Sequence, residues 1–92
     1  MKARLRLYPP LRTVVGASEV EVQLAESTKV KDLPGLLETE WGKGVSQVLD
    51  GEDSLIHMRI LINGRDLHAL RGCETVITDG DTVTFLPRIV GG

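Results

Sequence analysis

The sequence has only one cysteine and no long apolar run, and each scarcity excludes a class of protein. Cys73 stands alone, so the chain can form neither an intramolecular disulfide nor a cysteine-based metal cluster. No apolar stretch approaches the ~20 residues that a membrane-spanning helix requires, and the first residues alternate charged with apolar side chains instead of forming a signal-peptide core. The sequence therefore predicts a cytoplasmic protein with no membrane partner.

A strong charge of one sign and recognisable catalytic motifs are also missing. The formal net charge is −2, which gives no electrostatic reason to expect nucleic-acid binding. His57 and His68 are too isolated to form a metal site, and the sequence shows no glycine-rich phosphate loop and no nucleophile with an obvious base. We therefore expect no metal site and no enzyme active site. The length of 92 residues indicates one small globular domain.

Two short segments alternate between apolar and polar residues, as half-buried strands do. Residues 2–8 and 18–24 each carry three apolar side chains on one side, namely Ala3, Leu5 and Leu7, and Val20, Val22 and Leu24. The other side is basic in the first segment and acidic in the second, which favours opposite-charge cross-strand pairs. We predict an antiparallel pair, with the first strand ended by Pro9 and Pro10.

One amphipathic helix follows these strands. Its apolar residues recur at helical spacing, at Val30, Leu33, Leu36, Leu37 and Trp41. Ser27 or Thr28 is a plausible N-cap, and Gly42 lies at the C-terminal end. Because Pro34 lacks a backbone N–H, the alternative is a helix that begins near Asp32 or is kinked there.

Three further segments are predicted to be extended: residues 57–62, 75–77 and 82–86. Asn63-Gly64 favours a tight turn after the first of them. Asp79-Gly80-Asp81 superficially suggests a carboxylate pair, but a turn with Asx-type hydrogen bonds and a glycine at positive φ explains these residues.

The order strand, strand, helix, strand, strand predicts an α+β domain over residues 1–87, which Pro87 ends. A tail follows over residues 88–92. We interpret Trp41 as core or core-rim packing, and Cys73, whose only nearby basic residue is Arg71, as an ordinary structural or surface cysteine.

The tail ends in Gly91-Gly92, which on its own is more typical of a frayed terminus than of a site. Here it follows directly on a strand and a proline, which gives a short arm whose last two residues have no side chains, and such an arm can enter a narrow enzyme channel. The carboxylate of Gly92 is a poor acyl donor until a better leaving group is attached, and adenylation followed by attack of a sulfur nucleophile would give an acyl-sulfur species. The sequence shows no machinery for this chemistry, so a partner must supply it.

Several features recur in a fixed order from Ile62 onward, in INGRDLHALRGCETVITDGDTVTFLPRIVGG: an Asn-Gly turn, a DGD turn, an apolar last strand, a proline and a terminal Gly-Gly. With these and the opening strand followed by Leu11-Arg12 and Gly16, the chain resembles the MoaD/ThiS family of ubiquitin-like sulfur carriers. The resemblance implies a β-grasp fold, with a mixed sheet of four to five strands packed on one main helix.

The resemblance also implies a function. Gly92, preceded by Gly91, would be adenylated by an E1-like enzyme that uses ATP, and converted to a thiocarboxylate, with no cofactor bound to the chain itself. The acceptor would be a synthase subunit or a biosynthetic enzyme for molybdopterin, cysteine or another thio-cofactor or metabolite. An alternative is a ubiquitin-like modifier joined to lysines through Gly92, and a third reading is a noncovalent binding module.

The partner surface of ubiquitin-like relatives includes outward apolar residues of the sheet. The matching positions are Tyr8, Leu61 and Leu86, which the alternation also places on the outward face. In the tail, Arg88, Ile89 and Val90 depart from the family's usual small or proline residues. We expect them to contact the partner and to influence which partner fits.

Overall fold

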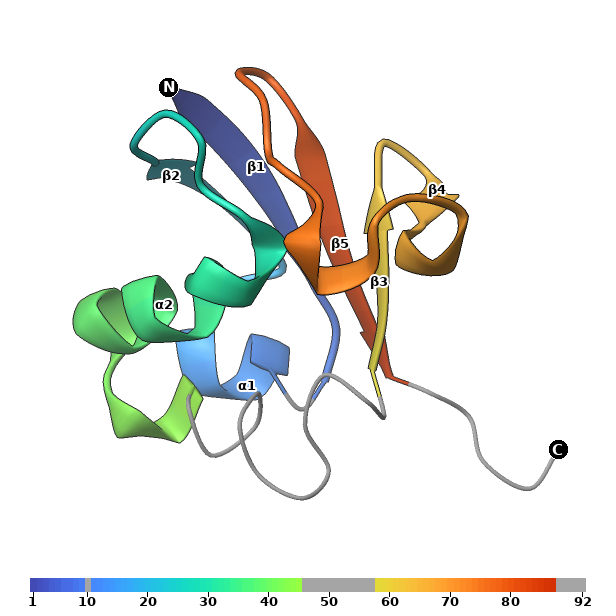
Figure 1. Cartoon of the computed structure of the whole chain (residues 1–92). Helices are drawn as coiled ribbons and strands as arrows, with labels where there is room; N and C mark the ends of the chain where they lie inside the picture. The colour runs from blue at the N-terminus through green and yellow to red at the C-terminus, as the bar shows by residue number, and fades with distance from the viewer. Residues whose placement is uncertain (10, 46–57, 88–92) are drawn as a thin grey trace, which may run out of the picture.

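Five strands form one mixed sheet in the order β2-β1-β5-β3-β4, and helix α2 packs against one of its faces (Figure 1). The computed structural model describes residues 1–9, 11–45 and 58–87. The elements are β1 (Lys2–Leu7), α1 (Leu11–Val15), β2 (Glu19–Gln23), the 3-10 turn η1 (Val30–Asp32), α2 (Leu33–Trp41), β3 (Met58–Ile62), β4 (Arg65–Asp66), the 3-10 turns η2 (Leu67–Ala69) and η3 (Gly72–Glu74), and β5 (Thr82–Pro87). This arrangement confirms the predicted α+β class and the mixed sheet on one main helix.

The first two strands form the antiparallel pair that their alternation predicts. Leu5 pairs with Val20, and Arg6 pairs with Glu19. The inward side chains of β1 are buried, and its outward side chains are exposed. The charged groups of the basic side chains on β1 lie near the acidic side chains of β2, with Arg4 Nε 3.0 Å from Glu19 Oε1. Because these side chains are largely exposed, the ion pairs favour the register but add little stability.

Strand β5 lies in the middle of the sheet and carries its most buried side chains. It runs parallel to β1 and antiparallel to β3, with Phe85 opposite Leu7 on one side and Ile60 on the other. Val83 and Phe85 are fully buried, as the alternation predicts. The strand extends one residue beyond the predicted range, because Pro87 still pairs with β3 as its last residue.

Helix α2 begins at Leu33, directly after η1, as the alternative start near Asp32 predicts. Pro34 lies in the first turn, where a backbone N–H has no acceptor within the helix, so its missing hydrogen costs no bond. Gly42 ends the helix with φ of 88°, and its N–H donates to the Glu38 carbonyl at 2.7 Å. The helix therefore has the C-terminal boundary that the sequence predicts.

Two details of the helix prediction are wrong. Thr28 is not its N-cap, because the Thr28 hydroxyl donates to the Ala25 carbonyl at 2.6 Å and Ser27, at φ of 66°, belongs to the same turn before η1. Leu36 is 44% exposed, whereas Leu37 is buried. Adjacent helical residues point about 100° apart, and here the buried stripe runs through Leu33, Pro34 and Leu37, which leaves Leu36 outside it.

Several short elements were not predicted. Helix α1 buries Leu11 completely, and its first turn forms where the Arg12 N–H donates to the Tyr8 carbonyl at 3.0 Å. Five residues with one buried side chain are too few to show a helical period. The Asn63-Gly64 turn is confirmed, with φ of 52° and 83°, but the two-residue strand β4 that it joins to β3 gave no alternation to read.

Candidate functional site

Two of the three residues predicted to receive a partner, Leu61 and Leu86, lie on the sheet face opposite α2. Leu86 follows the buried Phe85 and pairs across from Arg59, while Leu61 pairs with Thr84. Leu61 and Leu86 are therefore diagonal neighbours on β3 and β5. Tyr8 follows the end of β1 and is 40% exposed, whereas the two leucines are half-buried. The structure places Leu61 and Leu86 on one face and leaves Tyr8 exposed just beyond β1, and the contact of all three with a partner stays a prediction.

Ion pairs flank this outward row. On the β1 side, Arg4 and Arg6 both approach Glu19, at 3.0 and 3.8 Å. On the β3 side, Arg59 Nε donates to Asp66 Oδ2 at 3.0 Å. An apolar strip bounded by paired charges can exclude water at its centre and still orient a partner at its edges.

The reactive end itself lies outside the described residues. Gly91 and Gly92, and the expected partner contacts Arg88, Ile89 and Val90, all follow Pro87, the last residue of β5. Pro87 pairs with Met58 of β3. The structure therefore fixes the strand from which the tail starts, and the roles of the five tail residues stay predictions.

The carboxylates of the DGD turn serve the fold, as the sequence predicts. Asp81 is 8% exposed, and it accepts hydrogen bonds from Asn63 Nδ2 and from the Thr78 N–H, both at 2.8 Å. Asp79 accepts one from the Lys2 N–H at 2.8 Å. Gly80 between them has φ of 84°. Both carboxylates are thus engaged in tying the turn to the sheet.

The next residues are those that the sequence did not assign to a functional site: Trp41, Cys73 and the two histidines. Trp41 is partly buried against the core, which confirms its interpretation as core-rim packing, and Cys73 is exposed in η3. His57 and the side chain of His68 fall outside the description. Within residues 1–9, 11–45 and 58–87, no three His, Cys, Asp or Glu side chains gather as metal ligands. In that same part, no helix is long and apolar enough to cross a bilayer.

A charged groove lies between η1 and η3, and the sequence did not predict it. Here Glu74 receives hydrogen bonds from Lys29 Nζ at 2.9 Å and Lys31 Nζ at 2.8 Å. The bonds from Lys31 and then Lys29 lower the pKa of the Glu74 carboxyl from 4.5 to about 2, and the same contact raises the pKa of Lys31. Lys29 and Glu74 are 45 positions apart, so no local pattern predicts that they meet.

Known proteins place the chain in a family. The ThiS family model matches residues 5–92. The chain is 29% identical over 92 residues to small archaeal modifier protein 3 of Haloferax volcanii, in an alignment that covers all of both proteins. It is 34% identical over 80 residues to a putative sulfur carrier protein of Archaeoglobus fulgidus, which covers 85% of this chain and 89% of the relative.

Solved structures agree on the fold. The solution structure of the HVO 2177 protein of Haloferax volcanii has a TM-score of 0.80 and 30% identity, covering 100% of this chain and 87% of that one. The BexX/CysO complex of Amycolatopsis orientalis contains a chain with a TM-score of 0.75 and 25% identity, and the match covers 98% of this chain and 99% of that one. With a family match that spans nearly its whole length, the chain belongs to the ThiS family of ubiquitin-like β-grasp proteins.

Proposed function

We propose that the chain is a sulfur carrier whose Gly92 carboxylate is adenylated by an E1-like enzyme, converted to a thiocarboxylate and used as a sulfur donor. The observation that carries this proposal is that the ThiS match continues to residue 92, so it includes Gly91-Gly92 as well as the fold. The name of the Archaeoglobus relative, a putative sulfur carrier protein, agrees with it. The chain is then a substrate and carrier, and the enzymes that act on it supply the catalysis.

The position of β5 supports this role. The strand that leads into the tail is held on both sides, by the pairing of Phe85 with Leu7 and of Pro87 with Met58. A partner docked on the outward face at Leu86 would therefore meet the tail at a fixed starting point. A fixed start helps a partner to place the reacting carboxylate in its active site.

The chemistry at Gly92 has two steps. A carboxylate oxygen attacks the α-phosphorus of ATP, pyrophosphate leaves, and the resulting acyl adenylate carries AMP as its leaving group. Hydrosulfide then attacks the acyl carbon and displaces AMP, which gives the thiocarboxylate directly. Where a persulfide attacks instead, a thiol must next cleave the S–S bond of the acyl disulfide to release the thiocarboxylate. Glycines at the last two positions leave the acyl carbon unhindered, because neither has a side chain to meet the walls of a narrow channel.

Intact-mass spectrometry tests the proposal. The full chain is incubated with an E1-like enzyme from the same organism, ATP and a sulfur donor, and a second sample is prepared without ATP. We expect a mass increase equal to the exchange of one oxygen for sulfur, confined to the tail fragment that holds Gly92. A chain lacking Gly91 and Gly92 is the matched control. An intact chain that binds the enzyme and consumes ATP but never gains sulfur would contradict the proposal.

A second candidate function is protein modification, which the match to small archaeal modifier protein 3 favours. An amine of a target lysine would then displace AMP in place of sulfur. Arg88 is the last basic residue, so trypsin would leave an Ile-Val-Gly-Gly branch on the modified lysine. Such branched peptides in a digest of host proteins would establish conjugation, and their absence under conditions where the thiocarboxylate forms would limit the chain to sulfur transfer.

The acceptor is a synthase subunit or a biosynthetic enzyme for molybdopterin, cysteine or another thio-compound. The similar CysO chain was solved in a complex with BexX, which supports a partner protein for a chain of this shape. Purification of the tagged full chain from its host would identify the partner. Replacing Leu86 with Glu should remove that partner from the preparation if the outward face is the docking surface.

A further inference from the structure

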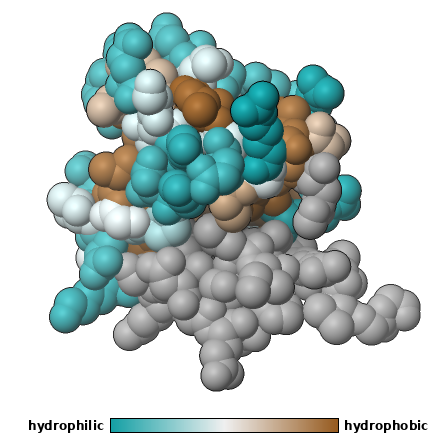
Figure 2. Space-filling view, viewed as in Figure 1, coloured by the Kyte–Doolittle hydropathy of each residue, from teal (hydrophilic) through white to brown (hydrophobic). Residues whose placement is uncertain are grey.

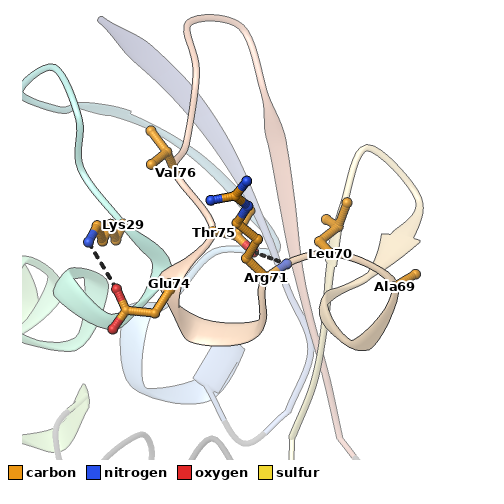
Figure 3. Close-up of a pocket in the computed structure, with 7 residues that line it drawn as sticks. All are labelled: Lys29, Ala69, Leu70, Arg71, Glu74, Thr75 and Val76. Carbon is orange, nitrogen blue, oxygen red and sulfur yellow. Dashed lines mark hydrogen bonds and ion pairs between the residues drawn. The ribbon is translucent and has the colours of Figure 1, made fainter.

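The groove between η1 and the η2–η3 segment has features that the carrier chemistry does not use (Figure 3). It is open to solvent, with a volume of about 880 Å³. Its lining includes Lys29, Leu70, Arg71, Glu74, Thr75 and Val76. The tail starts from β5, whereas these residues come from the turn before η1 and from the chain between η2 and β5.

The backbone holds the walls of the groove in place. Lys29 and Val76 form an antiparallel β-bridge, and the Val30 N–H donates to the Thr75 carbonyl at 3.0 Å. The Arg71 N–H donates to the Thr75 hydroxyl at 3.0 Å, which ties the η2–η3 turn to the same wall. The groove is therefore preformed, and its occupant would not have to order it.

The groove is locally basic in a chain whose net charge is −2. Lys29 and Lys31 share the single carboxylate of Glu74. The Arg71 side chain extends along the groove toward Val76, and within the described part of the chain its guanidinium has no hydrogen-bond or ion-pair partner (Figure 3). Three cations, of which Lys31 lies beside the lining, thus accompany two carboxylates, Glu74 and Asp32. The Arg71 guanidinium offers paired donors suited to a further carboxylate.

Apolar surface lies beside these charges. Val76 is 45% exposed, and Leu70 is only partly buried where it packs against the core. The surface on this side shows brown apolar areas interspersed with teal polar ones (Figure 2). An exposed valine next to a basic side chain can hold a large apolar side chain while the charge binds an anion. No aromatic side chain is among the described residues that line the groove, so nucleic-acid bases would find no aromatic ring there on which to stack.

We propose that this groove is a docking site for an acidic segment of a partner protein that also carries a large apolar side chain. A carboxylate of that segment binds the Arg71 guanidinium, and its apolar side chain packs on Val76 and Leu70. Glu74 competes with the segment, because it already holds the ammonium groups of Lys29 and Lys31. The site is separate from the outward face of the sheet and does not involve Gly92.

The test titrates the ¹⁵N-labelled full chain with a capped peptide of alternating glutamate and leucine and follows the backbone amide shifts. We expect saturable shifts at Lys29, Arg71 and Val76 that weaken as salt is added. A peptide of alternating glutamate and serine should bind more weakly, because it lacks the apolar side chain. An oligothymidylate serves as the nucleic-acid probe and should leave these amides unshifted.

Variants separate the groove from general charge attraction. Arg71→Glu should weaken the peptide about tenfold or more, since a charge-assisted bond is replaced by repulsion. Arg12→Glu makes the same charge change on α1 and should leave the affinity unchanged. Glu74→Gln should tighten binding, because it frees two ammonium groups. This opposite sign guards against a loss that merely reflects damage to the fold, which the amide spectrum of each variant also reports.

Several outcomes would overturn the proposal. These are a peptide that gives no saturable shifts, equal weakening by the changes at Arg71 and Arg12, weaker binding in the Glu74 variant, or oligothymidylate binding in place of the peptide. None of them bears on sulfur loading at Gly92, which is measured without the peptide. The two proposals can therefore fail independently.

Discussion

Replacing Asp81 with Asn should destabilise the protein more than the same change at Asp79, although both residues belong to one turn. The two oxygens of Asp81 accept from Asn63 Nδ2 and from the Thr78 N–H, both at 2.8 Å. An asparagine offers only one oxygen, so its amide nitrogen would face one of these donors. Asp79 uses one oxygen, for the exposed Lys2 N–H, and an asparagine there keeps that acceptor.

The size of the difference follows from burial and hydrogen bonding. Asp81 is 8% exposed, so a lost charge-assisted bond and an opposed donor should cost about 2–3 kcal/mol. A domain of 92 residues has a total free energy of unfolding of roughly 5–14 kcal/mol. The loss should lower the melting temperature by roughly 10 °C or more. Asp79→Asn should stay within about 0.5 kcal/mol.

Urea unfolding followed by Trp41 fluorescence measures both variants. Trp41 is the only tryptophan and lies partly buried against the core, so its emission reports loss of packing. An unchanged m-value with a lower midpoint would show that stability fell without a change in the surface exposed on unfolding. Equal midpoints for the two variants would refute the argument that the buried carboxylate, and not turn composition, holds this corner. A cycle with Asn63→Ala should give a coupling with Asp81 of about 1 kcal/mol.

Three other changes test the core, the hairpin and the groove. Phe85→Ala should cost about 3–5 kcal/mol because the ring is fully buried in the central strand, whereas Tyr8→Ala should cost far less, as thermal melts by circular dichroism would show. Gly64→Ala should cost about 1 kcal/mol in the same assay, since φ is +83° and no neighbour lies within 4 Å to add a clash. The pKa of Glu74 is lowered to about 2, so its ion pairs contribute fully to stability above pH 4.5 and their contribution is lost as the pH falls toward 2. An NMR titration of the Glu74 carboxyl with a midpoint near 4.5 would contradict this.

Features that depend on local alternation could be predicted from the sequence. The buried rows of β1 and β5, and the inward Ile60 and Ile62 of β3, follow from a period of two. Asn63-Gly64 and Asp79-Gly80-Asp81 were correctly interpreted as turns, because only a few residue types accept positive φ or cap a turn with their own side chains. Because positive φ is unfavourable for most L-amino acids, these residue types indicate a turn without any knowledge of the tertiary structure.

Features that depend on neighbours in space could not be predicted. The start of α2 was ambiguous because Pro34 permits either a kink or a first turn, and η1 decides between them. Leu36 satisfies the helical period as well as Leu37 does, yet the sheet covers only one of them. Helix α1 depends on the burial of Leu11 in the core, and strand β4 depends on pairing with the edge of β3.

The proposed site at Gly92 depends on local sequence, whereas the proposed groove depends on residues that meet only in the folded chain. Gly91-Gly92 can be recognised by position, because its chemistry needs only a carboxylate and two residues without side chains. The groove needs Lys29 and Glu74 brought together from 45 positions apart, and a guanidinium held beside an exposed valine. A substitution at any of these contacts would alter the groove and leave the tail intact. Proteins with the same tail can therefore differ in this surface, so the groove is better suited than Gly91-Gly92 to discriminate between partners.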